Sequence, residues 1–348
     1  MAFRYCESRS NTRMVVNGCT MRLRQTLLKL LARLGPAVTL LVLFLTALGV
    51  LVVTYGASFK WVEGPIVIAG TIALGLVAIH WFASVPALVR RQRGAAAMLA
   101  SDTRDVLRDW APFVVLMWAF ESLETYTGVI RQSTIVRSLY EIDLQWFGVE
   151  PTVWIGRFHH PVLTDWMAFA YGSYFVTPMI VAVMLSLRHR RADFSEMSTA
   201  LVIQMGIGFA LFLLFPAGPP RYYPPFLHGA FQPPQLFSHF GLYEFQQGAF
   251  DTADPVRTRS AFPSLHCSFG VLTLLSAWRF GDAVVPRMPR LFFWICVPVV
   301  VSLWCSTIYL RHHWIPDCLA GFVLGVSSDR IAIFLRTHWP SVATTQRT

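Results

Sequence analysis

Apolar residues come in blocks of about twenty along most of the chain, separated by short polar segments. A helix of about 20 apolar residues is long enough to cross the hydrocarbon core of a bilayer. The pattern therefore predicts an all-α fold, a polytopic membrane helical bundle of about eight transmembrane helices. The predicted spans cover about 36–55, 64–88, 110–130, 162–186, 197–216, 263–280, 291–310 and 316–335.

Two further segments do not fit a membrane span. Residues 131–161 mix aliphatic, aromatic and charged positions, which is typical of a helix lying along the membrane interface with Trp146 and Trp154 at headgroup level. Residues 216–262 are rich in Pro, Tyr, Phe and Gln and have too few aliphatic residues to cross a bilayer. The first apolar run is too long for the core of a signal peptide, so we expect it to be retained as the first span.

The composition agrees with a membrane protein. Of the 348 residues, 55% are hydrophobic and only 14% are charged, and the mean hydropathy is +0.50. A soluble domain would carry roughly 25% charged residues. The net charge of +10 does not indicate nucleic-acid binding, because the basic residues lie between apolar blocks. The six cysteines form no CxxC pair, so we interpret them as small buried residues and not as disulfides or a metal site.

The basic residues are divided unevenly between the two sides of the predicted bundle. One side holds 21 of the 29 Lys and Arg residues and the other holds 8. Cytoplasmic loops are the ones enriched in Lys and Arg. We therefore expect a multi-pass protein of the cell membrane with both termini in the cytoplasm. The cytoplasmic set consists of 1–35, 89–109, 186–196, 279–290 and 330–348.

Three polar motifs meet at the extracytoplasmic side in this topology. The fifth span ends in FPAGPPRYYPP (215–225), which contains Arg221. The sixth span begins at AFPSLH (261–266), and the eighth begins within IYLRHHWIPDCLAG (308–321). Arginines bind phosphate oxygens through paired hydrogen bonds, so a group of arginines and histidines on one side indicates chemistry on a phosphate.

The spacing in the last motif places a carboxylate next to a histidine. His313 and Asp317 are four residues apart, so on a helix they share a face, and Pro316 puts them near the helix start. A carboxylate that binds one imidazole nitrogen leaves the other as a nucleophile. His266 begins another helix, where the N–H groups of Ser264 to His266 form an anion site. These parts predict phosphoryl transfer through a covalent phosphohistidine.

SAFPSLH and YLRHHWIPDCLAG resemble the second and third signature motifs of the type 2 phosphatidic acid phosphatase superfamily, which also includes vanadium haloperoxidases. Leu265 replaces the glycine of the usual PSGH, and Thr307 stands where the third motif has an arginine. AGPPR (217–221) takes the place of the first motif. These departures resemble the inositol phosphorylceramide synthase branch, whose motifs contain PSLH and His-His-x-x-x-Asp.

The resemblance implies a role for each matched residue. His313 would be the nucleophile, Asp317 its orienting partner, and His266 the acid and then the base. We expect no cofactor and no metal, although the same three side chains are a possible metal site. Arg257 and Arg259 could also serve only to attract anionic headgroups. The phosphate-binding candidates are Arg221, Ser264 and Arg311, with Arg259 and Arg257.

The resemblance also divides the chain into three parts. Residues 110–335 would form a membrane-embedded phosphatase or phosphotransferase core with six helices. Residues 1–109 would add a basic cytoplasmic N-terminus and two accessory spans, and residues 336–348 a cytoplasmic tail.

Glu121 and Glu124 lie three residues apart in the outward half of the third predicted span, so they share a helix face. Ionisable residues inside a membrane segment are costly and usually line a cavity or pair with another group. Either the span ends before them and both are hydrated, or they bind the hydroxyl group of an acceptor or head group.

We interpret the chain as a membrane enzyme that transfers a phosphoryl or phospho-head group from a lipid phosphate at the extracytoplasmic face, like the inositol phosphotransferases. The acceptor would be an alcohol such as inositol or a lipid alcohol. With water as acceptor the protein would be a lipid phosphate phosphatase, and His266 can deprotonate either acceptor. A non-catalytic lipid-binding or transport protein is the remaining alternative.

Overall fold

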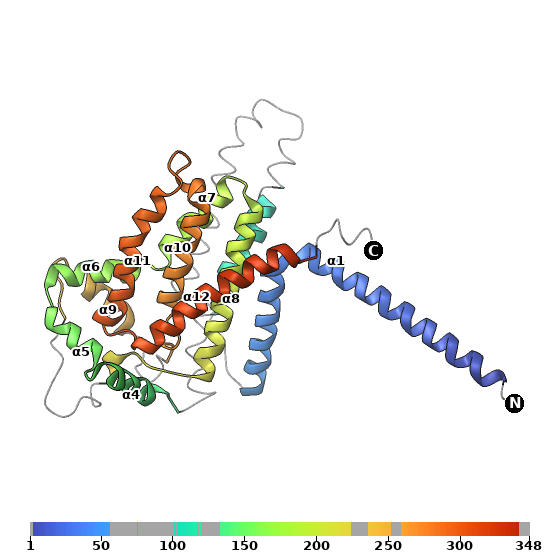
Figure 1. The fold of residues 1–348 in the computed structure, drawn as a ribbon, viewed down its shortest axis with the longest axis horizontal. Helices are drawn as coiled ribbons and strands as arrows, with labels where there is room; N and C mark the ends of the chain where they lie inside the picture. Colours follow the sequence, from blue (N-terminus) through green and yellow to red (C-terminus); the bar gives the residue numbers. More distant parts are fainter. Residues whose placement is uncertain are drawn as a thin grey trace.

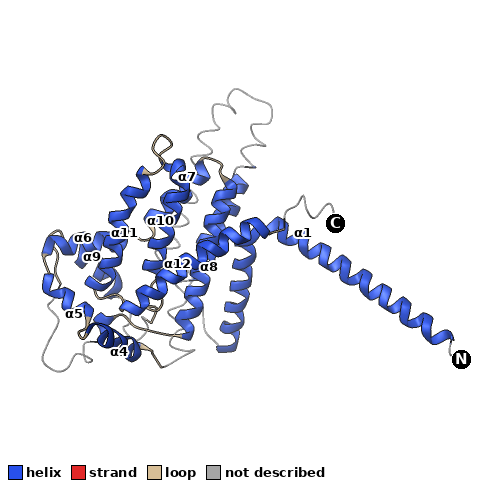
Figure 2. Cartoon of the chain, viewed as in Figure 1, coloured by secondary structure: helices blue, strands red, loops and turns tan. Residues whose placement is uncertain are grey.

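The computed structural model describes residues 3–55, 75, 101, 103–116, 118–119, 133–223, 236–251 and 259–340. Within these ranges the chain is helical, without strands, apart from one isolated bridge between Ala217 and Ser260. Figures 1 and 2 show the helices packed beside one another, which confirms the predicted all-α bundle. The second predicted span and the outward part of the third, with Glu121 and Glu124, lie outside the described residues.

Several of the described helices are long and apolar enough to cross a membrane. The first of them bends at Gly35, whose left-handed φ of 75° suits glycine, and its apolar half begins at Pro36. The fourth predicted span, 162–186, is not continuous, because two shorter helices meet there at an angle of 41°. The four long helices lie in α1 (Phe3–Tyr55), α8 (Arg191–Leu214), α11 (Leu291–Tyr309) and α12 (Ile315–His338), and the bent pair is α6 (Pro161–Gly172) with α7 (Val176–Leu187).

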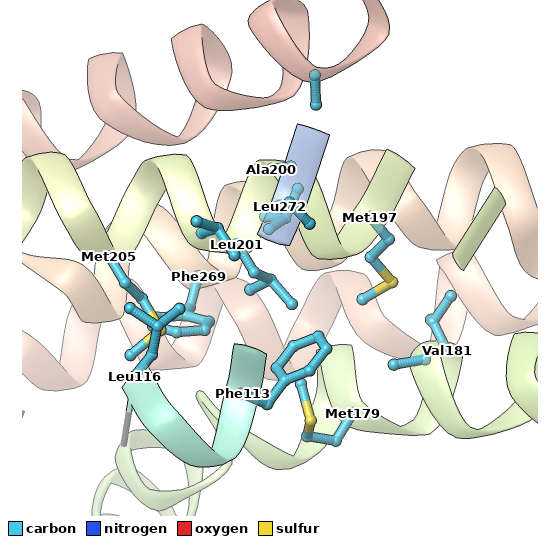
Figure 3. Close-up of a cluster of buried hydrophobic side chains, with 14 of the residues drawn as sticks. Phe113, Leu116, Met179, Val181, Met197, Ala200, Leu201, Met205, Phe269 and Leu272 are labelled. Atoms are coloured by element: carbon cyan, nitrogen blue, oxygen red, sulfur yellow. The ribbon is translucent and has the colours of Figure 1, made fainter. Parts of the chain in front are cut away.

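Helix α10 (Leu265–Val284) corresponds to the sixth predicted span and packs against α7, α8, α11 and α12. Its inner face is apolar: Phe269 and Leu272 lie among Leu201 and Met197 of α8 and Phe113 of the helical segment 103–116 (Figure 3). Lipid chains are as apolar as these side chains, so helices in a bilayer associate through close packing and interhelical hydrogen bonds. The central position of α10 follows from this packing on several sides.

The closest contact in the bundle joins α10 to α12. Gly321 of α12 lies against the carbonyl oxygen of Ser264, so close that a Cβ atom at this position would collide with that oxygen. The backbone N–H of Ser264 donates to the carbonyl of Asp317 at 2.9 Å. Gly325, one turn further along α12, lies against the carbonyl of Ser268. Glycines here allow two helix backbones to approach at their starts.

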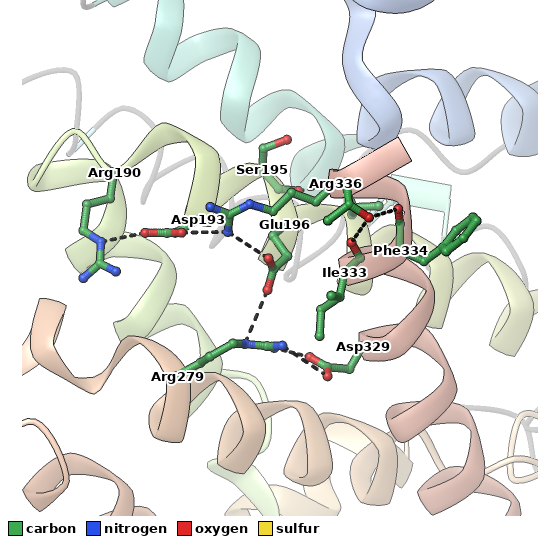
Figure 4. A network of polar contacts seen from close by, with 11 residues as sticks. Arg190, Asp193, Ser195, Glu196, Arg279, Asp329, Ile333, Phe334 and Arg336 are labelled. Carbon is green, nitrogen blue, oxygen red and sulfur yellow. Dashed lines mark hydrogen bonds and ion pairs between the residues drawn. The ribbon is translucent and has the colours of Figure 1, made fainter. Parts of the chain in front are cut away.

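A network of charged side chains, with two buried carboxylates, holds the other end of the same helices (Figure 4). Arg279 of α10 lies between Glu196 of α8, at 3.4 Å from its Nε, and Asp329 of α12. Arg336 of α12 contacts Glu196 and Asp193 at 2.8 Å. Because Glu196 and Asp329 are buried, their charges require these partners. The network therefore fixes the register of α8, α10 and α12.

The predicted interfacial segment forms three short helices, α4 (Val136–Phe147), α5 (Pro151–Ile155) and the 3₁₀-helix η1 (Gly156–Phe158). Gly148 ends α4 with a left-handed φ of 67°, and the proline at the start of α5 favours a new helix. Trp146 and Trp154 are about half exposed, at 54% and 47%. The segment is thus a chain of short helices and not the single helix that was predicted.

Helix α4 rests on the start of α12. The rings of Tyr140 and Trp314 meet edge to face with centroids 6.2 Å apart, and the N–H of Ile315 points to the carboxylate of Asp143 at 3.4 Å. Asp143 is fully buried, and this burial raises its pKa to about 7, with the nearby charge of Asp317 acting in the same direction. The folded protein therefore holds a proton on Asp143 more tightly than the unfolded chain does.

We expect the Gly321→Ala variant to be destabilised by about 1–3 kcal/mol, because the added methyl group must push α12 away from α10. Thermal unfolding in detergent measures the loss. Gly49→Ala in α1 is the matched control, since a Cβ there meets nothing within 4 Å. Equal unfolding temperatures for the two variants would contradict the close contact.

We expect Asp143→Asn to change how stability depends on pH. A carboxyl group whose pKa is about 4 unfolded and about 7 folded stabilises the fold fully below pH 4, and this contribution is lost as the pH rises to about 7. The amide keeps an oxygen for the Ile315 N–H but does not ionise, so the variant should gain stability over the parent at pH 8 more than at pH 5. Unfolding temperatures at both values test this, with the exposed Glu141→Gln on the same helix as control. A gain that does not grow with pH would count against a raised pKa.

Candidate active site

Two histidines from separate segments are in direct contact. His266 is the second residue of α10, and His313 lies in the loop between α11 and α12. The Nε2 atom of His313 lies 3.4 Å from Nδ1 of His266. Two histidines that are 47 positions apart in the chain therefore bring their ring nitrogen atoms face to face.

Hydrogen-bond acceptors fix the ring of His313. Its Nδ1 lies 3.0 Å from the carbonyl oxygen of Ala261 and 3.5 Å from Oδ2 of Asp317. Since a carbonyl can only accept, Nδ1 must carry the proton, and Nε2 is left with a lone pair directed at His266. The ring is held more closely by the Ala261 carbonyl than by the predicted carboxylate.

The relation of His313 to Asp317 differs from a shared helix face. Helix α12 begins at Ile315, so His313 precedes it, and Asp317 reaches back across the first turn. The Oδ2 atom of Asp317 accepts the backbone N–H of Trp314 at 3.0 Å. The carboxylate therefore caps the helix start and orients the histidine loop at the same time.

Backbone hydrogen bonds join the three motifs predicted to meet. The N–H of Ala261 donates to the carbonyl of Ala217 at 2.8 Å, and the N–H of Arg221 donates to the carbonyl of Arg311 at 3.2 Å. The indole N–H of Trp314 donates to the carbonyl of Gly218 at 3.1 Å. These hydrogen bonds bring the three motifs together in one place.

Two tyrosines that were not predicted form one wall of the site. The ring of Tyr171 stacks on His266 and on His312, with centroids 4.0 Å and 4.2 Å apart, and Tyr174 lies 4.2 Å from His266. Both come from YGSY at the bend between α6 and α7, which turns them inward. The small residues Gly and Ser inside an apolar run were the available signal for this bend.

His312 has a packing role in this geometry. It is buried, and burial holds the pKa of its imidazole well below the usual value, with the Arg221 charge adding to the effect. Its ring faces Tyr171 and not the contact between His313 and His266. Burial and stacking therefore indicate a structural role for His312.

Arg221 lies near the tyrosine wall, and its charge acts on both Tyr171 and His312. It lies in the 3₁₀-helix η2 (Pro220–Tyr222), and its guanidinium donates to Gln247 Oε1 at 2.5 Å and to the Tyr222 hydroxyl at 2.8 Å. These contacts orient a cation beside the histidines.

Gln247 belongs to α9 (Leu242–Asp251), a short helix that packs against α6. The segment before α9 is anchored by Asp165 of α6, whose carboxylate accepts the N–H groups of His239, Phe240 and Leu242 at 2.7, 2.8 and 3.1 Å. The segment is thus held at two places, before α9 by Asp165 and within α9 by the contact of Gln247 with Arg221.

The other predicted phosphate ligands are placed differently. Ser264 is fully buried, its hydroxyl caps α10 by accepting the N–H of Cys267 at 3.3 Å, and its own N–H is bonded to Asp317. The predicted anion site at this helix start is therefore limited to the N–H groups of Leu265 and His266. Ser264 fixes the start of α10, and its backbone N–H does not face the site.

The remaining arginines lie within or next to the motifs. Arg311 adopts a left-handed φ of 60°, and burial lowers the pKa of its guanidinium. Arg259 pairs with Ala217 through its carbonyl, and its charge acts on Tyr223. Arg257 lies outside the described residues.

Thr307 stands where the superfamily motif has an arginine. It is fully buried in α11, and its hydroxyl lies 3.3 Å from Sγ of Cys318. Its carbonyl accepts the N–H groups of His312 and His313 at 2.9 and 3.0 Å. Thr307 therefore supports the histidine loop through its backbone.

Comparisons with known proteins agree with these motifs. The family model of the PAP2 superfamily matches residues 137–329, which include all three motifs. The phosphoinositol dihydroceramide synthase of Bacteroides thetaiotaomicron is 23% identical over 234 residues, covering 63% of this chain and 74% of that protein. No solved structure gives a significant match. With more than half of its length inside the family match, the chain belongs to the PAP2 superfamily and is a membrane enzyme of the lipid phosphotransferase or phosphatase kind.

Proposed function

We propose that the protein transfers a phospho-head group from a lipid phosphate to an alcohol through a phosphohistidine formed on His313. The observation that carries this proposal is the Nε2 atom of His313, which has its lone pair directed at His266, 3.4 Å away, while Nδ1 is held by acceptors. A nucleophile with an acid–base partner within reach is the arrangement that covalent phosphoryl transfer needs.

The reaction has two displacements at phosphorus. In the first, Nε2 of His313 bonds to phosphorus, the bond to the leaving oxygen breaks, and His266 in its protonated form gives that oxygen its proton. In the second, His266 takes the proton of the acceptor hydroxyl, whose oxygen attacks phosphorus and releases His313. Each histidine ends in its starting state, so the cycle needs no other reactant.

Positive groups near the histidines stabilise the charge that develops on the phosphoryl oxygens. Arg221 is the leading candidate because it is already oriented beside Tyr171. The N–H groups at the start of α10 add a partial positive charge, and Arg311, Arg259 and Arg257 are further proposed ligands.

An alcohol acceptor is favoured over water by the likeness to a protein named phosphoinositol dihydroceramide synthase. We propose inositol-bearing head groups and lipid alcohols as the substrates to examine first. Glu121 and Glu124 are proposed to bind the acceptor hydroxyl. If water is the acceptor, the same residues make a lipid phosphate phosphatase, and the ratio of alcohol product to free phosphate distinguishes the two.

The site is proposed to face the extracytoplasmic side, with both termini in the cytoplasm. The support is the distribution of Lys and Arg, together with the position of the histidines and the Arg279 network at opposite ends of α10. The catalytic core is proposed to be residues 110–335, with 1–109 and 336–348 as accessory parts.

We expect His313→Ala to abolish any labelled phosphoenzyme formed from a radiolabelled lipid phosphate after acid quenching. His266→Ala should instead slow both displacements by about 10²–10⁴-fold, because it removes proton transfer and leaves the nucleophile. Asp317→Asn should fall between them, since it disturbs the orientation of His313. His160→Ala, an exposed histidine, is the control and should behave like the parent.

The opposite result, an adduct retained by His313→Ala and lost in His266→Ala, would reverse the two roles. A parent protein that binds lipid phosphates but forms neither adduct nor product would support the non-catalytic alternative.

We expect Phe240→Cys, in a background without native cysteines, to react with a membrane-impermeant maleimide in intact cells. Phe240 is 77% exposed in the segment before α9, on the proposed outer side. Met288→Cys, 56% exposed in the turn between α10 and α11, should react only after permeabilisation. Labelling in the reverse order would overturn the proposed orientation.

A further inference from the structure

An apolar cavity of about 550 Å³ lies beside the histidine site, between the interfacial helices and the ends of α11 and α12. Phe147 of α4 and Trp154 of α5 form one side. The other side includes Cys305 and Ile308 of α11 and Cys318 of α12. In Figure 1 the short helices α4 and α5 lie next to these ends, in agreement with the contacts of α4 with α12 and of α5 with α11.

The inner wall of the cavity is shared with the site. Cys318 and Ile308 pack in one cluster with Cys267, which follows His266 in α10. Ile315, which also lines the cavity, is two residues beyond His313. The cavity therefore borders the segments that carry the two histidines.

We infer that this cavity binds a hydrocarbon chain of the lipid phosphate whose head group reacts at His313, an assignment that rests on the proposed function. A phosphate ester carries its chain within a few bonds of phosphorus, so the chain must lie close to the histidines. The cavity has the apolar lining and the volume of a ligand pocket. Its wall of interfacial helices places it at the depth where head group and chain meet.

The cavity sets which substrates are used. Ile315, Cys318, Leu319 and Phe322 occupy one face of α12 at helical spacing, so a chain that follows this face is buried along about two turns. Each buried methylene group improves binding, so a long-chain lipid phosphate gains more from the cavity than a short-chain one. Trp154 lines the cavity and is about half exposed, so it lies at the edge of the cavity.

Filling the cavity tests this assignment. Cys305→Trp places a large ring in it, whereas Ile295→Trp adds the same ring at an exposed position on the same helix outside the lining. We expect Cys305→Trp to raise KM for dipalmitoyl phosphatidic acid about tenfold or more, because burial of roughly two methylene groups is worth that much. Turnover of dibutyryl phosphatidic acid should stay within about twofold of the parent, and Ile295→Trp should match the parent on both lipids. Unchanged KM for the long-chain lipid, or an equal loss on both lipids, would overturn the assignment.

A second measurement uses the parent protein and needs no turnover. Cys305 is a free, exposed thiol that lines the cavity, so hexadecyl phosphate should slow its alkylation by a small maleimide, and butyl phosphate should not. Peptide mass spectrometry separates Cys305 from the other cysteines. Protection without turnover would leave the cavity assignment standing while the proposed function fails. Turnover without protection would refute the cavity alone.

Discussion

The contact between the starts of α10 and α12 is the constraint on which the site depends. Gly321 allows the Ser264 carbonyl to approach, and the N–H of Ser264 donates to the carbonyl of Asp317. The hydrogen bond and the close packing together fix the two helix starts relative to each other. His266 and His313 lie directly beside this contact, so their separation is set by backbone geometry and not by long side chains.

The opposite ends of the same helices are held by a different kind of interaction. Arg279 joins Glu196 and Asp329, and each of these charges would be costly to bury alone. Uncharged backbone contacts at one end and ion pairs at the other leave α10 little freedom to slide or rotate. A site built at its first turn is therefore supported by the whole length of the helix.

The features predictable from the sequence were those with a short repeat or a local motif. Apolar blocks indicated the spans, and the spacing of His313 and Asp317 indicated that these groups meet. Residues that depend on tertiary structure were not predictable: the Ala261 carbonyl that binds His313 belongs to a loop, and Tyr171 reaches the site only because a span is bent. Asp143 was also missed, because its burial comes from α12, more than 160 positions later in the chain.

The tie between Arg221 and Gln247 links occupancy of the site to the freedom of α9. A phosphate that accepts the Nη1–H now donated to Gln247 would replace the amide oxygen of Gln247, while Asp165 continues to hold the start of the segment. Gln247, in the middle of α9, would then lose this contact, while the residues before the helix stay anchored. In the proposed reaction, binding of the negatively charged substrate would thus remove one of the contacts that hold α9, and departure of the phosphate would restore it.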